Sequence, residues 1–223
     1  MKLIAHRKNT VAELCATDPK YGIEVDIRSH GERLIIHHDA FVAGECFEQW
    51  LDAYRHSTLI LNVKEEGLEK RLIDLMRTKG IDDYFFLDQS FPFLVKWSKA
   101  GLRRCAVRVS EFESIDTAMT LAGRVDWVWV DCFSHFPLSG DDARRLKQAG
   151  FKLCLVSPEL QGRDAETEIP QLAALLHERQ IVADAVCTKR PDLWEATDLW
   201  QGTDLQGTDL QATDRPTGTA GPR

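Results

Sequence analysis

Four ionisable residues that could transfer protons lie close together at the start of this 223-residue chain. They stand at or near the ends of the apolar runs KLIAHR, GIEVDIRS and RLIIHHD, and they are His6, Glu24, Asp26 and His38. Imidazole has an ordinary pKa near neutrality, so a histidine pair can accept one proton and donate another at pH 7. The pattern predicts a site for proton transfer beside two carboxylates.

Arg7 and Lys64 add fixed positive charge to this set. A guanidinium can bind two phosphate oxygens at once, and an ammonium acts as a point charge. Two histidines that flank a phosphorus atom, with these cations on its oxygens, suit phosphodiester cleavage. We therefore expect His6 and His38 to be the catalytic pair, and Arg7 and Lys64 to bind the substrate phosphate.

Glu24 and Asp26 share one face of a strand, as do Asn62 and Lys64, because side chains two residues apart point the same way. If that face is the interior of the fold, two carboxylates and an amide oxygen converge there. Such a ligand set favours one Mg²⁺ or Ca²⁺ ion over zinc. A second interpretation is structural, with Glu24 and Asp26 forming ion pairs to Arg28 or Lys64.

Short β-rich runs alternate with helical patterns along most of the chain. Strands are expected at residues 2–6, 22–28, 58–64, 83–88, 104–109, 126–131, 151–157 and 183–188. Helices are expected at residues 67–80, 91–101, 110–123, 139–150 and 168–180. Eight such units favour a single-domain (β/α)8 TIM barrel over an open doubly wound sheet, which would show a glycine-rich first turn.

Polar residues follow the expected strands at their carboxyl ends, where barrels of this type carry their chemistry. Between the second and third of these strands, the segment GERLIIHHDA (31–40) predicts a hairpin-like excursion that turns at Gly31. The excursion would bring His37 or His38 to the mouth of the barrel. His38 is the better candidate, because His37 points to the opposite face.

Composition excludes several classes of protein. The net charge of −7 argues against a nucleic-acid protein. No apolar stretch approaches the length of a membrane span, and a motif that begins at residue 6 leaves no room for a signal peptide, so we expect a cytoplasmic protein with a small-molecule phosphodiester substrate. The six cysteines form no CxxC pair and are expected to be free, mostly buried thiols. The oligomeric state stays open.

The end of the chain differs from the rest. The segment TDLWQGTDLQGTDLQATD repeats a TDLQG-like unit and offers few apolar anchors. We expect residues 1–196 to form the catalytic domain and residues 197–223 to be a disordered or loosely attached tail.

The motifs LIAHR, IEVDIR, IIHHD and LNVK, in this order and spacing, resemble the glycerophosphodiester phosphodiesterase family of the PLC-like phosphodiesterase superfamily. The resemblance implies a TIM barrel that hydrolyses a glycerophosphodiester, or a similar polyol phosphodiester, to an alcohol and glycerol phosphate. It implies these roles: acid-base catalysis by His6 and His38, phosphate binding by Arg7 and Lys64, and binding of one divalent ion by Glu24, Asp26 and Asn62.

Three features depart from the family pattern. Lys8 stands where the family has glycine and the following loop is missing, Asn62 stands where it has glutamate, and LVSPE (155–159) replaces an aromatic step. Losing one carboxylate weakens metal binding, with Glu65 or Asp88 as possible compensation. Two alternatives follow: a lyase-like reaction that releases a cyclic phosphate, and a barrel that binds a phosphorylated ligand without turnover.

Overall fold

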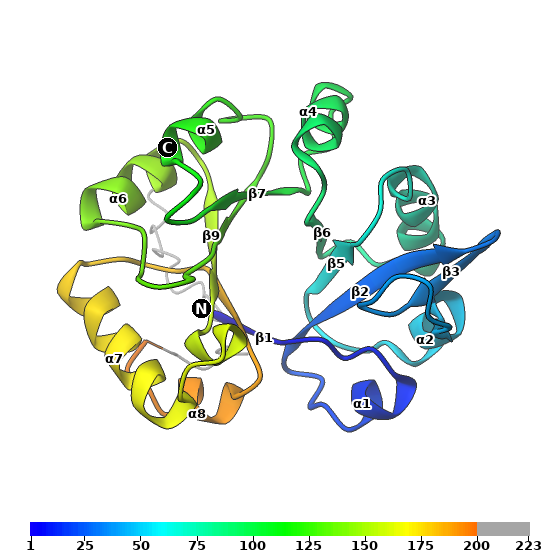
Figure 1. Ribbon diagram of the computed structural model, residues 1–223, viewed down its shortest axis with the longest axis horizontal. Coiled ribbons are helices and arrows are strands. Elements are labelled where there is room, and N and C mark those ends of the chain that lie inside the picture. The colour runs from blue at the N-terminus through cyan, green and yellow to red at the C-terminus, as the bar shows by residue number, and fades with distance from the viewer. Residues whose placement is uncertain (200–223) are drawn as a thin grey trace, which may run out of the picture.

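The strands that carry the predicted site form one curled sheet in the computed structural model, which describes residues 1–199 (Figure 1). Its parallel strands are β1 (Lys2–Ala5), β2 (Gly22–His30), β5 (Leu59–Val63), β6 (Tyr84–Leu87), β7 (Ala106–Val109), β8 (Trp127–Val130), β9 (Lys152–Val156) and β10 (Ala185–Thr188). All eight predicted strands are confirmed, with bounds within two residues of those expected.

The sheet curls back on itself because β1, the first strand, pairs in parallel with β10, the last strand, as well as with β2. From β2 it continues through β5 and β6, and from β10 it continues through β9, β8 and β7. Between β6 and β7 a single parallel bridge joins Phe86 to Cys105, and the Phe86 N–H donates to the Arg104 carbonyl at 2.9 Å. We call this junction the β6–β7 seam. The chain is thus a single-domain α/β fold with a curled eight-stranded sheet.

The interior of the curled sheet is apolar along the strands and polar at their carboxyl ends. The parallel strands other than β2 supply its apolar side chains, which are Ile4, Ile60, Phe85, Leu87, Ala106, Trp127, Trp129, Cys154, Val156, Ala185 and Cys187. Alternation with a period of two then places His6 above Ile4, and Asn62 and Lys64 above Ile60. On β2 the same face carries Glu24 and Asp26, so the predicted chemistry rests on an apolar base.

Helices cover the outside of the curled sheet (Figure 1). Three lie where the sequence predicts them: α3 (Glu69–Lys79), α4 (Phe91–Lys99) and α6 (Gly140–Gln148). The predicted helix at 110–123 was wrong over its first turns, because Ser110 and Glu113 form a bridge and α5 covers only Ile115–Met119.

The remaining helices differ from expectation for local reasons. The helix α7 (Ala165–Glu178) begins before residue 168 because the Asp164 side chain accepts from the Thr167 N–H and caps it. Four short elements had no prediction, since five to seven residues or one 3₁₀ turn give little periodicity. They are α1 (Val11–Cys15), α2 (Phe47–Ala53), η1 (Pro158–Gln161) and α8 (Pro191–Glu195).

The predicted excursion is confirmed. Strand β2 runs on into an antiparallel hairpin with β3 (Arg33–Ile36), and β4 (Glu45–Cys46) pairs with β3 in turn. Gly31 makes the turn with φ of +62°, a conformation that glycine adopts without strain. Because β3 ends at Ile36, the next two residues are the two histidines that the sequence places at the mouth.

Three further expectations concern the whole chain. All six cysteines are free, and Cys105, Cys132, Cys154 and Cys187 are buried as expected. Across residues 1–199, no helix combines the length and the apolar character that crossing a bilayer requires. The prediction of a loose tail at 197–223 lies outside the described residues, apart from 197–199.

Candidate active site

His6 follows the end of β1, where its backbone N–H donates to the Thr188 carbonyl at 2.9 Å and holds it against β10. The ring is largely buried, with Nε2 3.8 Å from Glu24 Oε2. Burial lowers the pKa of His6 to about 3, and the charges of Arg7 and Lys189 act in the same direction. Within the described residues its Nδ1 atom has no hydrogen-bond partner. The ring is therefore uncharged near pH 7 and has an unused polar atom.

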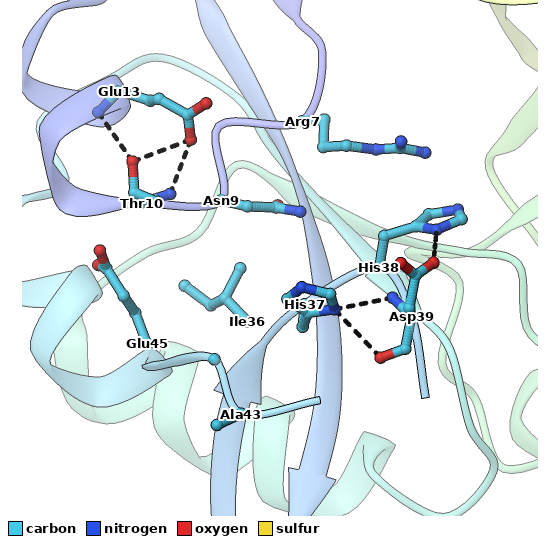
Figure 2. A pocket seen from close by; sticks show the side chains of 11 residues that line it. Arg7, Asn9, Thr10, Glu13, Ile36, His37, His38, Asp39, Ala43 and Glu45 are labelled. Atoms are coloured by element: carbon cyan, nitrogen blue, oxygen red, sulfur yellow. Dashed lines mark hydrogen bonds and ion pairs between the residues drawn. The ribbon is translucent and has the colours of Figure 1, made fainter. Parts of the chain in front are cut away.

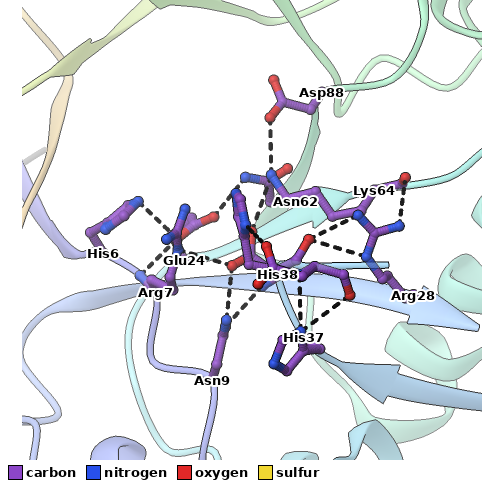
Figure 3. Close-up of polar contacts among 12 residues, drawn as sticks. His6, Arg7, Asn9, Glu24, Arg28, His37, His38, Asn62, Lys64 and Asp88 are labelled. Carbon is purple, nitrogen blue, oxygen red and sulfur yellow. Dashed lines mark hydrogen bonds and ion pairs between the residues drawn. The ribbon is translucent and has the colours of Figure 1, made fainter. Parts of the chain in front are cut away.

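Arg7 reaches two carboxylates because its backbone is left-handed, with φ of +51°. Its N–H donates to Glu24 Oε2 at 2.7 Å, while its side-chain Nε lies 3.1 Å from Asp26 Oδ2. Asn9 completes the turn: its amide donates to the same Asp26 oxygen at 2.8 Å and accepts from the Asp26 N–H at 3.0 Å. The short first loop thus closes directly over β2 (Figure 3).

Glu24 and Asp26 are almost wholly removed from solvent, with exposed fractions of 1% and 0%. Burial, with repulsion from Asp26, raises the pKa of Glu24 to about 7. Burial alone would raise the pKa of Asp26 as well, but attraction to Lys64 and Arg7 and the hydrogen bond from Asn9 hold it below its ordinary value. The two neighbouring carboxylates therefore differ in proton affinity, and Asp26 is the one that stays charged.

Asn62 and Lys64 approach the carboxylates from β5, whose register pairs Asn62 with Asp26. The Asn62 amide donates to Glu24 Oε1 at 2.8 Å. Lys64 Nζ lies 3.1 Å from Asp26 Oδ1 and 3.3 Å from Asp88 Oδ2. Arg7 and Lys64 therefore contact different oxygens of one buried carboxylate, which holds a cation on each of them at the end of the strands. Figure 3 shows Arg7 and Lys64 in this cluster.

His38 lies at the end of the excursion and is more open, with 46% of its side chain exposed. Its Nδ1 atom is 2.8 Å from Asp39 Oδ1, which orients the ring. Its carbonyl accepts from both Nε and Nη2 of Arg28, and Nη1 of Arg28 donates to the Lys64 carbonyl at 3.2 Å. Arg28 thereby ties the excursion to β5 through carbonyl groups, whereas Lys64 is the ion-pair partner of the carboxylates.

A cavity of about 700 Å³ opens between Arg7 and the excursion. Arg7 and His38 lie at one end of it, and Glu45 lies at the other beside Thr10 and Glu13 (Figure 2). His37 also lines this cavity, and its Nδ1 accepts from the Asp39 N–H at 2.9 Å. Charged and polar side chains line this first cavity together with apolar surface, so it can accept a hydroxylated or charged group.

The structure brings six predicted residues into one network of contacts: His6, Arg7, Glu24, Asp26, Asn62 and Lys64. His38 is joined to this network through Arg28 and shares the first cavity with Arg7. Asn9 and Asp39 were not predicted, yet both are hydrogen-bond partners of site residues. Their nearness in sequence to site residues could have indicated this role, since Asn9 follows Arg7 by two residues and Asp39 follows His38 directly.

The predicted ligand set for a divalent ion consists of two carboxylates and one amide. Across residues 1–199, no group of three or more His, Cys, Asp or Glu side chains has the geometry of a metal site. The predicted set nevertheless offers hard oxygen atoms, and Asn62 Oδ1 is buried without a hydrogen-bond partner in the described chain. An orphaned amide oxygen beside two carboxylates fits a single Mg²⁺ or Ca²⁺ ion.

Neither residue suggested to compensate for Asn62 joins this set. Glu65 accepts from the Ser29 N–H at 2.5 Å, which directs it to the hairpin. Asp88 pairs with Lys64 and with Arg108, and Arg108 also pairs with Asp131. These contacts form a second polar cluster, at the ends of β6, β7 and β8.

Comparison with solved structures places this geometry on a known fold. A glycerophosphodiester phosphodiesterase from Agrobacterium tumefaciens matches with a TM-score of 0.61 at 15% identity, over 88% of this chain and 98% of that one. A putative glycerophosphoryl diester phosphodiesterase from the same organism matches with a TM-score of 0.61 at 12% identity, over 86% and 95%. The chain shares its fold with these phosphodiesterases.

A third such structure, a glycerophosphoryl diester phosphodiesterase from Parabacteroides distasonis, has a TM-score of 0.59 at 10% identity and covers 85% of this chain and 83% of that one. No protein-family model and no curated protein sequence matches the chain. The predicted resemblance is therefore confirmed at the level of the fold.

Proposed function

We propose that this protein is a phosphodiesterase that hydrolyses a glycerophosphodiester, or a similar polyol phosphodiester, to an alcohol and glycerol phosphate. One observation carries the proposal: Arg7 and Lys64 are fixed on opposite oxygens of the buried Asp26. Two cations held in position in this way can bind the oxygens of a phosphate without first rearranging. The shared fold and the charged side chains that line the first cavity support the same substrate class.

The reaction needs one proton acceptor and one proton donor. Water attacks phosphorus, a new P–O bond forms, and the proton of the water passes to one histidine. The bond from phosphorus to the leaving alcohol breaks, and the other histidine protonates that oxygen. We assign these two steps to His6 and His38, since His6 has an unused ring nitrogen and Asp39 orients the ring of His38.

We propose that the site binds one divalent ion, Mg²⁺ or Ca²⁺, with Glu24, Asp26 and Asn62 as its ligands. The orphaned oxygen of Asn62 and the two buried carboxylates support this assignment. When bound, the ion would add positive charge beside the phosphate oxygens. Arg7 and Lys64 already pair with Asp26, so a bound ion would share the charge of that carboxylate with them.

We also propose that the curled sheet closes as a complete (β/α)8 barrel. The single bridge at the β6–β7 seam supports closure, and so does the stacking of Phe85 on Trp127 beneath it, with ring centroids 4.5 Å apart. The catalytic domain at residues 1–196 and the cytoplasmic location remain predictions from the sequence.

The test is hydrolysis of glycerophosphocholine, glycerophosphoethanolamine and bis-p-nitrophenyl phosphate with Mg²⁺, Ca²⁺ or Mn²⁺. We expect His6→Ala and His38→Ala each to lower kcat by about 10²- to 10⁴-fold, the usual contribution of a general acid or base. His30→Ala is the matched control, because His30 is exposed at the far end of β2. Full activity in either catalytic variant would contradict the assigned pair.

Two further measurements would distinguish the alternative functions from hydrolysis. A cyclic phosphate seen by phosphorus NMR at early times would indicate a lyase-like reaction, in which a substrate hydroxyl replaces water as the attacking group. Calorimetric binding of glycerol phosphate without turnover of any diester would indicate a binding protein.

A further inference from the structure

Lys189 follows the end of β10, on the face of that strand that forms the interior of the curled sheet. Cys187 is buried in this interior, and an alternation of two places Lys189 on the same face. The register of β1 with β10 pairs Ala5 with Thr188, and the His6 N–H donates to the Thr188 carbonyl at 2.9 Å. Lys189 is therefore the neighbour of His6 on the side of β1 away from β2.

The backbone of Lys189 is held in place by a carboxylate that does not pair with its ammonium group. The Lys189 N–H donates to Glu159 Oε1 at 2.8 Å. The Thr188 hydroxyl donates to the same oxygen at 2.6 Å, and the Ser157 hydroxyl donates to Glu159 Oε2. Amide and hydroxyl groups thus use both oxygens of Glu159, and within residues 1–199 no carboxylate forms an ion pair with Lys189.

This lack of a partner distinguishes Lys189 from the two cations already assigned to the phosphate. Arg7 pairs with Asp26, and Lys64 pairs with Asp26 and Asp88. A carboxylate that pairs with a cation compensates part of its charge, so an incoming anion gains less from that cation. Lys189 is exposed and uncompensated among the described residues, so its ammonium can interact with an anion at full charge.

The position of Lys189 allows contact with a phosphate that His6 serves. Neighbouring strands lie about 4.8 Å apart, so a phosphate bound over His6 is about one strand spacing from the backbone of Lys189. The charge of Lys189 also lowers the pKa of His6, and it contributes more to this shift than the charge of Lys64 does. Both observations place the Lys189 ammonium near the reacting centre.

We propose that Lys189 is a third substrate-binding cation, whose ammonium donates to an oxygen of the phosphate during hydrolysis. The inference rests on the proposed phosphodiesterase function and adds a residue to the same site. Arg7 and Lys64 then act from the β2 side of His6 and Lys189 acts from the β10 side, so positive charge flanks the phosphorus atom. Cations in these positions stabilise the negative charge that the phosphate oxygens carry in the transition state.

The experiment removes the ammonium and leaves the backbone contacts unchanged. Lys189→Met keeps a long side chain without a charge, and the bond from the Lys189 N–H to Glu159 does not depend on that side chain. We expect kcat/KM for glycerophosphocholine and for bis-p-nitrophenyl phosphate to fall about 10- to 100-fold, the usual range for losing a charged hydrogen bond. Lys189→Arg keeps the charge and should restore most of the lost activity.

Lys99→Met is the matched control. Lys99 is also exposed and has no ion-pair partner in residues 1–199, but it lies at the end of α4 that leads to the start of β7, away from the site. An equal loss in the two Met variants, or no loss in Lys189→Met, would overturn the inference. A loss seen only with glycerophosphoserine, whose alcohol carries a carboxylate, would assign Lys189 to the alcohol and would also overturn it.

Binding of glycerol phosphate separates failure of this inference from failure of the proposed function. If no diester is cleaved, the proposed function fails, and calorimetry with glycerol phosphate then tests Lys189 alone. We expect the dissociation constant to be at least about tenfold higher for Lys189→Met than for the parent, and unchanged for Lys99→Met. Equal dissociation constants for Lys189→Met and the parent, or no binding by the parent, would overturn the inference even without turnover.

Discussion

At the ends of β2 and β5, one carboxylate, Asp26, lies between the cations Arg7 and Lys64. At the ends of β6, β7 and β8, one cation, Arg108, lies between the carboxylates Asp88 and Asp131. We call these the β2–β5 rim and the β6–β8 rim. Both pair carboxylates with basic side chains at the same edge of one sheet, and Lys64 joins them through Asp88.

The two rims differ in how completely their polar atoms are paired. In the β6–β8 rim, Asp131 accepts from the Gln161 amide and from the Cys132 N–H in addition to pairing with Arg108. In the β2–β5 rim, His6 Nδ1 and Asn62 Oδ1 are buried without hydrogen-bond partners in the described residues. Unpaired buried polar atoms destabilise a fold unless a ligand uses them. The second rim has one such atom, Gln89 Oε1 beside Asp88, so the larger number of unpaired atoms favours the first rim as the site of chemistry.

Matched Asp→Asn substitutions test this contrast, and the larger effect is expected at Asp26. Asp26→Asn removes the charge that holds Arg7 and Lys64, so we expect kcat/KM for a cleaved glycerophosphodiester to fall by at least about 100-fold. Thermal unfolding checks that the variant is folded at the assay temperature. A loss below about tenfold would place the phosphate elsewhere.

Asp131→Asn is the counterpart in the β6–β8 rim. It leaves Arg108 with one carboxylate, and Asp131 is only 3% exposed. We expect the free energy of unfolding in urea to fall by about 2–3 kcal/mol, less than for a fully buried pair because Arg108 is partly exposed. The value of kcat/KM should stay within about threefold of the parent. A large loss of activity in a stable variant would make this rim part of the catalytic site.

Asn62→Glu sharpens the comparison by adding the carboxylate that the β2–β5 rim lacks. We expect the affinity for Mg²⁺, measured by calorimetry, to rise at least about tenfold, because a third anionic oxygen joins the ligand set. The same variant should have a lower Tm in EDTA and recover it with Mg²⁺, since three carboxylates then repel one another without the ion. Asn62→Gln, which adds length but no charge, should show neither effect.

The smallest expected effect is a pH dependence in the loops beside the β6–β8 rim. Burial would raise the pKa of Glu111, but hydrogen bonds from the N–H groups of His135, Ser134 and Phe133 lower it to about 2. A depressed pKa stabilises the fold above the ordinary value of 4.5, and this contribution is lost as the pH falls toward 2. Glu111→Gln should lower Tm by about 2–4 °C at pH 7.

The difference in Tm between Glu111→Gln and the parent should shrink between pH 4.5 and pH 2, which thermal unfolding across that range would measure. A difference that stays constant with pH would show that these hydrogen bonds do not depend on the charge of Glu111.

Strand periodicity predicted most of the fold and the facing of the site. An alternation of two was enough to put Glu24 with Asp26, and Asn62 with Lys64, on one face of their strands. That this face is the buried interior of the sheet is seen only in the structure. The alternation could not predict that Arg7 and Lys64 take opposite oxygens of Asp26, because that depends on the left-handed backbone at Arg7. Local patterns carry no information on such a conformation or on pairing between distant loops.

The same limit applies to the two rims. Asp88, Arg108 and Asp131 could be located at strand ends from the sequence, but their mutual pairing depends on the three-dimensional order of β6, β7 and β8. The helix predicted at 110–123 failed at its start for a related reason, since Ser110 and Glu113 fold back on each other. Tertiary contacts outweighed local propensity there.

The β6–β7 seam is the weakest junction between neighbouring parallel strands of the curled sheet. Every other neighbouring pair of parallel strands is joined by a ladder, whereas the seam depends on one bridge and on the Asp88–Arg108 ion pair above it. A ring with one weak junction widens there first, so the Phe86 amide should exchange its hydrogen sooner than amides in the ladders. Because Asp88 also pairs with Lys64, widening of this junction would change the contacts of a cation in the β2–β5 rim.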